Sequence, residues 1–111
     1  MQEAPIIQKV YDFYHLFYVQ IDHLPKKSRV VLSPKIEEQI LKLLELSAKA
    51  SSEKPENKAK YLNEASSCLD LLKIYIRLLY DLKLVNQAKN IELQTVLQEI
   101  GKMLGGWIKI C

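Results

Sequence analysis

Apolar residues recur three or four positions apart along most of the chain, a spacing that gathers them on one face of a helix. The first stripe predicts a helix over about residues 5–24, because Pro25 ends the segment. A second stripe follows Ser33 and Pro34, which have the form of an N-cap with proline at the first helical position. A second helix is therefore predicted over residues 33–52.

The last apolar stripe, the fourth along the chain, has a residue typical of a helix start before it and a glycine pair typical of a helix end after it. Asn86 is a suitable N-cap, which predicts a helix over residues 86–105. Gly105 and Gly106 have the form of a C-cap, where a left-handed residue lets the chain turn. We expect Trp107 and the isoleucine after it to fold back on the end of this helix.

The third stripe predicts the longest helix, over residues 56–84, and it would exceed about 40 Å at 1.5 Å per residue. No stretch alternates with period two for long enough to form a sheet. Short connections place neighbouring helices antiparallel. The sequence therefore predicts an all-α fold, an antiparallel up-down-up-down four-helix bundle, with a single domain over residues 1–111.

The composition is that of one globular domain. The chain has 111 residues, of which 49% are hydrophobic and 26% charged, with 3 Gly and 4 Pro, so few turns are expected. It has no apolar run near the roughly 20 residues that span a bilayer and no basic signal-peptide region, so we expect a cytoplasmic protein with no membrane partner. Cys68 and Cys111 are not spaced like the ligands of a metal site, and two cysteines are too few for a disulfide-rich scaffold. Both are therefore expected to be reduced.

The motifs that are typical of common enzyme active sites are absent from the sequence. A di-iron bundle needs two Glu-x-x-His motifs, whereas the two histidines here, His15 and His23, have no Glu three residues before them. Cys68 falls within a predicted helix, where a thiol is ordinarily inert, and no Gly-rich phosphate loop is present. We therefore expect no enzyme, no catalytic residue, no metal and no cofactor.

Basic residues form two groups, although the net charge is only +3. The first group lies in the predicted link before the second helix and in that helix's first turn; the second lies on the third helix beside Tyr75 and Tyr80. Either group could contact phosphates, while solvation of the first and neutralisation of the second by Asp70 and Asp81 remain alternatives. The candidate nucleic-acid-binding residues are Lys26, Lys27, Arg29, Lys35, Lys73, Arg77 and Lys83.

The chain has six tyrosines, which is more than a monomeric bundle needs. Several of them make the first and third predicted helices apolar on more than one face. A helix that is apolar on two faces favours packing against a second surface outside its own bundle. We therefore expect self-association. The candidate oligomer-interface residues are Tyr11, Tyr14, Tyr18 and Trp107.

Four segments give the chain a resemblance to a known family. They are Pro5 to Asp12 (PIIQKVYD), His23 to Arg29 (HLPKKSR), Leu72 to Leu84 (LKIYIRLLYDLKL) and Glu99 to Trp107 (EIGKMLGGW). On these residues the chain resembles the accessory variability determinant (Avd) proteins of diversity-generating retroelements. The resemblance implies a non-catalytic four-helix bundle that forms a positively charged, ring-shaped homopentamer. It also implies binding to the element's reverse transcriptase and template RNA, in support of mutagenic cDNA synthesis and retrohoming.

The resemblance carries some basic positions over and leaves others out. Positions that are typically Arg or Lys in the family are occupied here by Lys26, Arg29, Lys35, Arg77 and Lys83. A family glycine before the second helix is replaced by Ser33 and Pro34, and a basic stretch after it by Ala48 to Glu56. The alternative is a four-helix bundle of the ribosomal-RNA intervening-sequence type, acting as a structural oligomer or protein-interaction module.

Overall fold

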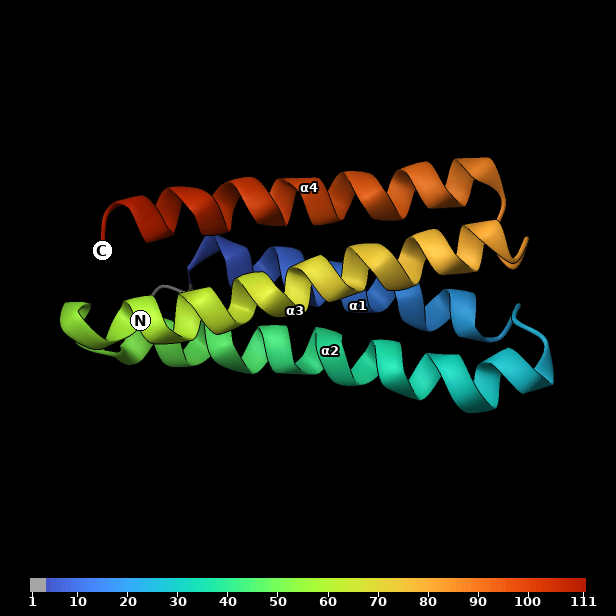
Figure 1. Cartoon of the computed structure of the whole chain (residues 1–111), viewed down its shortest axis with the longest axis horizontal. Helices are drawn as coiled ribbons and strands as arrows, with labels where there is room; N and C mark the ends of the chain where they lie inside the picture. The colour runs from blue at the N-terminus through green and yellow to red at the C-terminus, as the bar shows by residue number, and fades with distance from the viewer. Residues whose placement is uncertain (1–3) are drawn as a thin grey trace.

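The computed structural model describes residues 4–111, and this part of the chain forms four helices and no strand. They are α1 (Pro5–Ile21), α2 (Lys26–Ser52), α3 (Pro55–Asp81) and α4 (Gln87–Lys109). Successive helices run in opposite directions along the long axis (Figure 1). Each helix packs against two others, with α1 contacting α2 and α4, and α3 contacting the same two. The prediction of an all-α fold is confirmed.

The core is a continuous stripe of aliphatic and aromatic side chains drawn from all four helices. Phe13 and Phe17 of α1 are fully buried, as the spacing of apolar residues predicts. The other large, fully buried side chains are Ile36, Ile40, Leu43, Leu62, Leu72, Ile76, Leu79, Leu93, Leu97 and Ile100. Burial of these side chains is the main force that holds the helices together.

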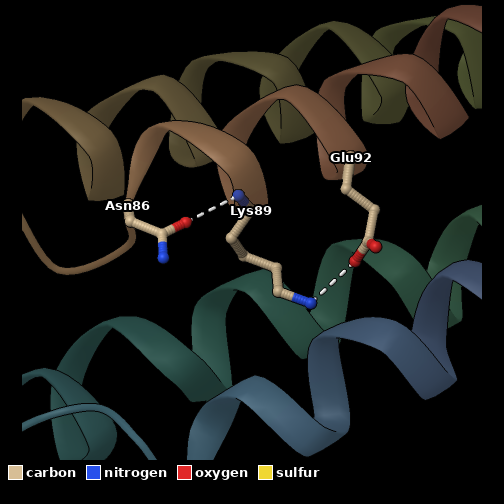
Figure 2. Close-up of polar contacts among 3 residues, drawn as sticks. All are labelled: Asn86, Lys89 and Glu92. Carbon is tan, nitrogen blue, oxygen red and sulfur yellow. Dashed lines mark hydrogen bonds and ion pairs between the residues drawn. The ribbon is translucent and has the colours of Figure 1, made fainter.

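The N-cap predicted for the last helix is confirmed. The side-chain oxygen of Asn86 accepts a hydrogen bond from the backbone N–H of Lys89 at 2.8 Å. Figure 2 shows this contact beside the ion pair that Lys89 Nζ forms with Glu92 Oε1 at 2.7 Å. Because the first N–H groups of a helix have no partner within the helix, this cap fixes where α4 begins.

The predicted start of the second helix is wrong. It begins at Lys26 rather than Ser33, and Pro34 lies inside it. Ser33 is buried and forms no cap, and its hydroxyl has no hydrogen-bond partner in the described residues. The helix starts earlier because Leu32, four residues before the buried Ile36, extends the stripe that packs on the core. Tertiary packing therefore overrides the local signal of the proline.

The predicted end of the fourth helix is also wrong. Gly105 and Gly106 lie within α4, which continues to Lys109, and no glycine has a positive φ. Trp107 does not fold back; it continues the helix and packs, half-buried, against the core. A glycine pair permits a left-handed turn but does not require one, and the apolar contacts beyond the pair keep the chain helical.

Two other ends differ from prediction by a few residues. The first helix ends at Ile21 rather than near residue 24, and the third ends at Asp81 rather than residue 84. Between residues 4 and 111, no helix combines the length and apolar character needed to cross a membrane.

Candidate nucleic-acid interface

Three members of the first basic group lie in the first turn of α2 rather than in a loop, and the fourth, Lys35, lies in the interior of α2 rather than in its first turn. Lys26, Lys27 and Arg29 are all exposed in the first turn, which contains no acidic residue. The N-cap is Pro25, which provides no side-chain acceptor for the first N–H groups. Cations at this end oppose the helix dipole, so the turn presents uncompensated positive charge to solvent. An anion is the natural partner for such a turn.

Lys83, from the other end of the sequence, lies at the C-terminus of α3 in an unusual conformation. Its φ is 62°, and it is the only described non-glycine residue with a positive φ. The N–H of Lys83 donates to the carbonyl of Tyr80, and that of Leu84 to the carbonyl of Leu79, both at 2.9 Å. These two bonds define a Schellman motif, in which the left-handed position is usually glycine. A lysine is therefore held here despite an unfavourable backbone conformation.

The fold brings these two segments together at one end of the bundle. A hollow of about 390 Å³ is lined by Lys27 and Val31 of α2 and by Leu82 and Leu84, which flank Lys83. Lys27 lines this hollow, whereas Lys83 lines a second hollow together with Asp81. The two hollows share Leu84. We call the four cations at this end of the bundle, Lys26, Lys27, Arg29 and Lys83, the basic end. Figure 1 shows that the start of α2 and the α3–α4 connection lie at this same end. Neither segment alone indicated this neighbourhood.

The remaining three predicted cations lie elsewhere. Lys35 is exposed on α2, and Arg77 is exposed on α3. Lys73 is half-buried between α3 and α4, where its Nζ lies 3.7 Å from the position of a Cβ added to Gly101. Thus four of the seven candidates lie at one end of the bundle, and the other three lie further along the helices.

None of the seven cations forms an ion pair within the described chain. The ion pairs in residues 4–111 are Lys9 with Glu99 and Lys89 with Glu92. The contact with Glu99 raises the pKa of Lys9, chiefly through its hydrogen bond. Neutralisation of the second group by direct contact with Asp70 or Asp81 is therefore not seen in this part of the chain.

The predicted interface tyrosines divide into two kinds. Tyr14 is half-buried and its hydroxyl donates to Glu37 Oε2 at 2.8 Å, a bond that raises the pKa of Tyr14. Tyr11 and Tyr18 are 53% and 60% exposed. The ring of Tyr18 stacks on that of Tyr14 at 6.0 Å. Tyr14 thus serves contacts inside the bundle, while Tyr11 and Tyr18 remain available for a partner.

Sequence reasoning missed the exposed aliphatic residues beside the basic end. Val30, Val31 and Leu82 are 63%, 58% and 53% exposed. The signal was the run of three apolar residues that ends at Leu32, because a helix buries only about every third or fourth position. With the start of the helix placed at Ser33, this run was assigned to a link.

The cysteines are both free, Cys68 buried in α3 and Cys111 exposed. Burial raises the pKa of the Cys68 thiol, so its nucleophilic thiolate form is disfavoured. Among residues 4–111, no group of three or more His, Cys, Asp or Glu side chains is placed to hold a metal ion.

The four helices and their shared core define the chain as a four-helix bundle with an exposed cationic end. The model of the bAvd-like family matches residues 5–111, so the chain belongs to the bAvd-like family. This match confirms the resemblance to the Avd proteins. The comparison with curated proteins found no significant match.

Proposed function

We propose that the chain binds the reverse transcriptase and template RNA of a diversity-generating retroelement in the cytoplasm. It thereby supports mutagenic cDNA synthesis and retrohoming without catalysing a step itself. Membership of the bAvd-like family supports the role of an accessory protein. The binding of nucleic acid is supported by one observation: the basic end gathers four cations from two chain segments and pairs none of them with a described carboxylate.

The physical reason lies in the position of these charges. Cations in the first turn of a helix weaken that helix, and phosphate oxygens at the same place reverse the effect. Each phosphate neutralised also releases counterions, so binding must fall steeply with salt. Lys35, Lys73 and Arg77 extend the contact along the bundle, because all three carry charge outside the basic end.

Self-association belongs to the same proposal. A single chain carries a net charge of only +3, and a ring of several copies multiplies the field that attracts RNA. We propose a homopentamer, as the family resemblance implies. Tyr11 and Tyr18 provide its contacts, because both are large and exposed in the isolated chain. Trp107, also a predicted interface residue, is half-buried in each chain and contributes less.

The test is charge reversal at the start of α2 with a matched control on the same helix. Lys26→Glu with Arg29→Glu alters the basic end, and Lys42→Glu with Lys49→Glu makes the same charge change on exposed positions further along. The first variant gains favourable dipole interactions, so weaker binding cannot be attributed to unfolding. We expect it to lose RNA affinity and to lower the slope of log K against log salt by about 1.4, at about 0.7 for each lost single-strand phosphate contact.

The control variant is expected to keep both the slope and most of the affinity. Equal loss in the two variants would mean that only net charge matters, and the basic end would not be the interface. Co-purification with the retroelement's reverse transcriptase, measured for the same pair, tests the polymerase contact separately.

A second candidate function is favoured by the exposed tyrosines. If the chain is a structural oligomer of the ribosomal-RNA intervening-sequence type, its partner binding is insensitive to salt and depends on Tyr11 and Tyr18. Tyr11→Ala with Tyr18→Ala then abolishes partner binding, whereas reversal of the basic end leaves it unchanged. Sedimentation of both variants distinguishes loss of the oligomer from loss of the partner.

A further inference from the structure

The end of the bundle opposite the basic end contains a pocket that follows from the unequal lengths of the helices. The α1 helix has 17 residues, whereas α2 and α3 have 27 each, a difference of about 15 Å at 1.5 Å per residue. Figure 1 shows that α1 begins short of the end reached by the other three helices. The start of α1 forms one wall of a pocket of about 590 Å³, and the last turns of α4 form another. We call it the Trp107 pocket.

The walls of the Trp107 pocket are largely apolar and carry a single kind of charge. Apolar surface comes from Ile6, Met103, Trp107 and Ile110. Lys58 of α3 is the one charged residue among the described residues that line it. The ammonium of Lys58 lies 5.6 Å from the centroid of the Trp107 ring. This cation–π contact holds the positive charge beside the apolar wall.

Gly106 leaves the pocket open. Glycine within a helix lowers stability, and at Gly101 an added Cβ would lie in ordinary contact with Leu69 Cδ2, at 3.4 Å. At Gly106, which lines the pocket, an added Cβ would meet no described atom within 4 Å beyond its own helix and chain neighbours. Close packing of a neighbouring helix is therefore not the reason for a glycine at this position. The pocket provides a reason, because any larger side chain would project toward it.

We propose that the Trp107 pocket binds a small amphiphilic anion, with its apolar body against Trp107 and its anionic group at Lys58. The volume falls in the range of small-molecule sites, which are mostly apolar with a few polar groups that fix orientation. A cation faces this site and no described carboxylate lines it, so an anionic group is favoured over a cationic or neutral one. The inference is independent of the proposed nucleic-acid contact, because the pocket and the basic end lie at opposite ends of the bundle.

Two probes with the same aromatic body separate the apolar contribution from the charge. They are 8-anilinonaphthalene-1-sulfonate and the uncharged N-phenyl-1-naphthylamine. Trp107 is the only tryptophan, so energy transfer from its emission to a bound probe reports binding near this residue. We expect saturable binding of the sulfonate with one site per chain, and about fivefold weaker binding of the uncharged probe.

Two adjacent glycines provide a matched pair of variants. Gly106→Leu fills the pocket, whereas Gly105→Leu adds the same side chain at a position that lines a different hollow, between α3 and α4. Both changes favour helix, so both variants are expected to fold. We expect Gly106→Leu to weaken both probes about tenfold or more, and Gly105→Leu to change neither by more than about twofold.

Variants of the lysines test the role of charge. Lys58→Gln is expected to reduce the affinity for the sulfonate to that of the uncharged probe, and Lys60→Gln, on an exposed part of α3, to have no effect. The proposal is wrong if the sulfonate binds without energy transfer from Trp107, or if both glycine variants weaken it equally. It is also wrong if Gly106→Leu alone disrupts the oligomer while the wild-type chain binds no probe, because a second copy then occupies the pocket.

Discussion

Lys83 combines a strained backbone with a charge that we place in the interface, and a single substitution separates the two. Its φ of 62° is one that an L-residue adopts at a free-energy cost of about 1–2 kcal/mol, while glycine adopts it freely. Glycine also makes the unfolded chain more flexible, which offsets about 0.4–1 kcal/mol of the gain. Relative to Lys83→Ala, which loses the same charge, Lys83→Gly is therefore expected to raise the free energy of unfolding by about 0.5–1 kcal/mol, or Tm by about 2–6 °C.

The matched variant is Lys83→Ala, which loses the same charge but keeps the Cβ and hence the strain. It is expected to be no more stable than the wild-type chain, because the cation at the C-terminus of α3 is also lost. Both variants are expected to bind RNA more weakly, with the salt slope lowered by about 0.7. The assays are urea unfolding followed by circular dichroism and RNA titration at several salt concentrations.

The two readouts can refute the reasoning separately. If Lys83→Gly is no more stable than Lys83→Ala, the left-handed Schellman position is not formed in solution. If both variants bind RNA with the wild-type affinity and slope, Lys83 makes no phosphate contact, and the basic end reduces to the first turn of α2. Greater stability together with weaker binding would show that the chain keeps this lysine for its partner rather than for its fold.

Three further substitutions or reactions test the structure itself. Pro34→Ala should raise the free energy of unfolding by about 1–3 kcal/mol, because it supplies the missing N–H in the interior of α2. A decrease in that free energy, measured by urea unfolding, would place the start of the helix at Pro34 instead. Asn86→Ala should lower the free energy of unfolding by about 1 kcal/mol through loss of the N-cap of α4, and no change would argue against that cap. With a thiol reagent, Cys111 should react at once and Cys68 only as the chain unfolds, because Cys68 is buried and its burial raises the pKa of the thiol. Equal reaction rates of the two cysteines in a stopped-flow measurement would contradict the burial of Cys68.

The periodic part of the fold was predictable because it depends on many residues at once. The core stripe of α3 has buried residues from Leu62 to Leu79 at helical spacing, so a single unusual residue could not change the result. Pro34 and the Gly105–Gly106 pair led to wrong boundaries because each is a local signal, and packing of Leu32 and Trp107 on the core outweighed it. Asn86 succeeded where they failed because a cap is satisfied by its own helix and needs no tertiary contact.

The candidate site was predictable as a set of charges but not as an arrangement. Lys26, Lys27 and Arg29 are neighbours in sequence, so their proximity was evident. Lys83 joins them only because the end of α3 returns to the start of α2, which depends on where both helices stop. Its positive φ was hidden because lysine is not a residue that favours the left-handed region. The Trp107 pocket was hidden for a similar reason, since it results from the late start of α1 relative to its neighbours.

The two ends of the bundle are far enough apart to act independently. The long dimension of the molecule is 44 Å, while electrostatic interactions between exposed charges are screened over about 8 Å at physiological salt. RNA phosphates at the basic end therefore exert little force on an anion held by Lys58, and the converse also holds. Steep salt dependence at one end and weak dependence at the other follow, because the first site depends on several solvated charges and the second mainly on burial of apolar surface. A coupling between RNA and probe binding would thus have to travel through the packing of the helices rather than through charge.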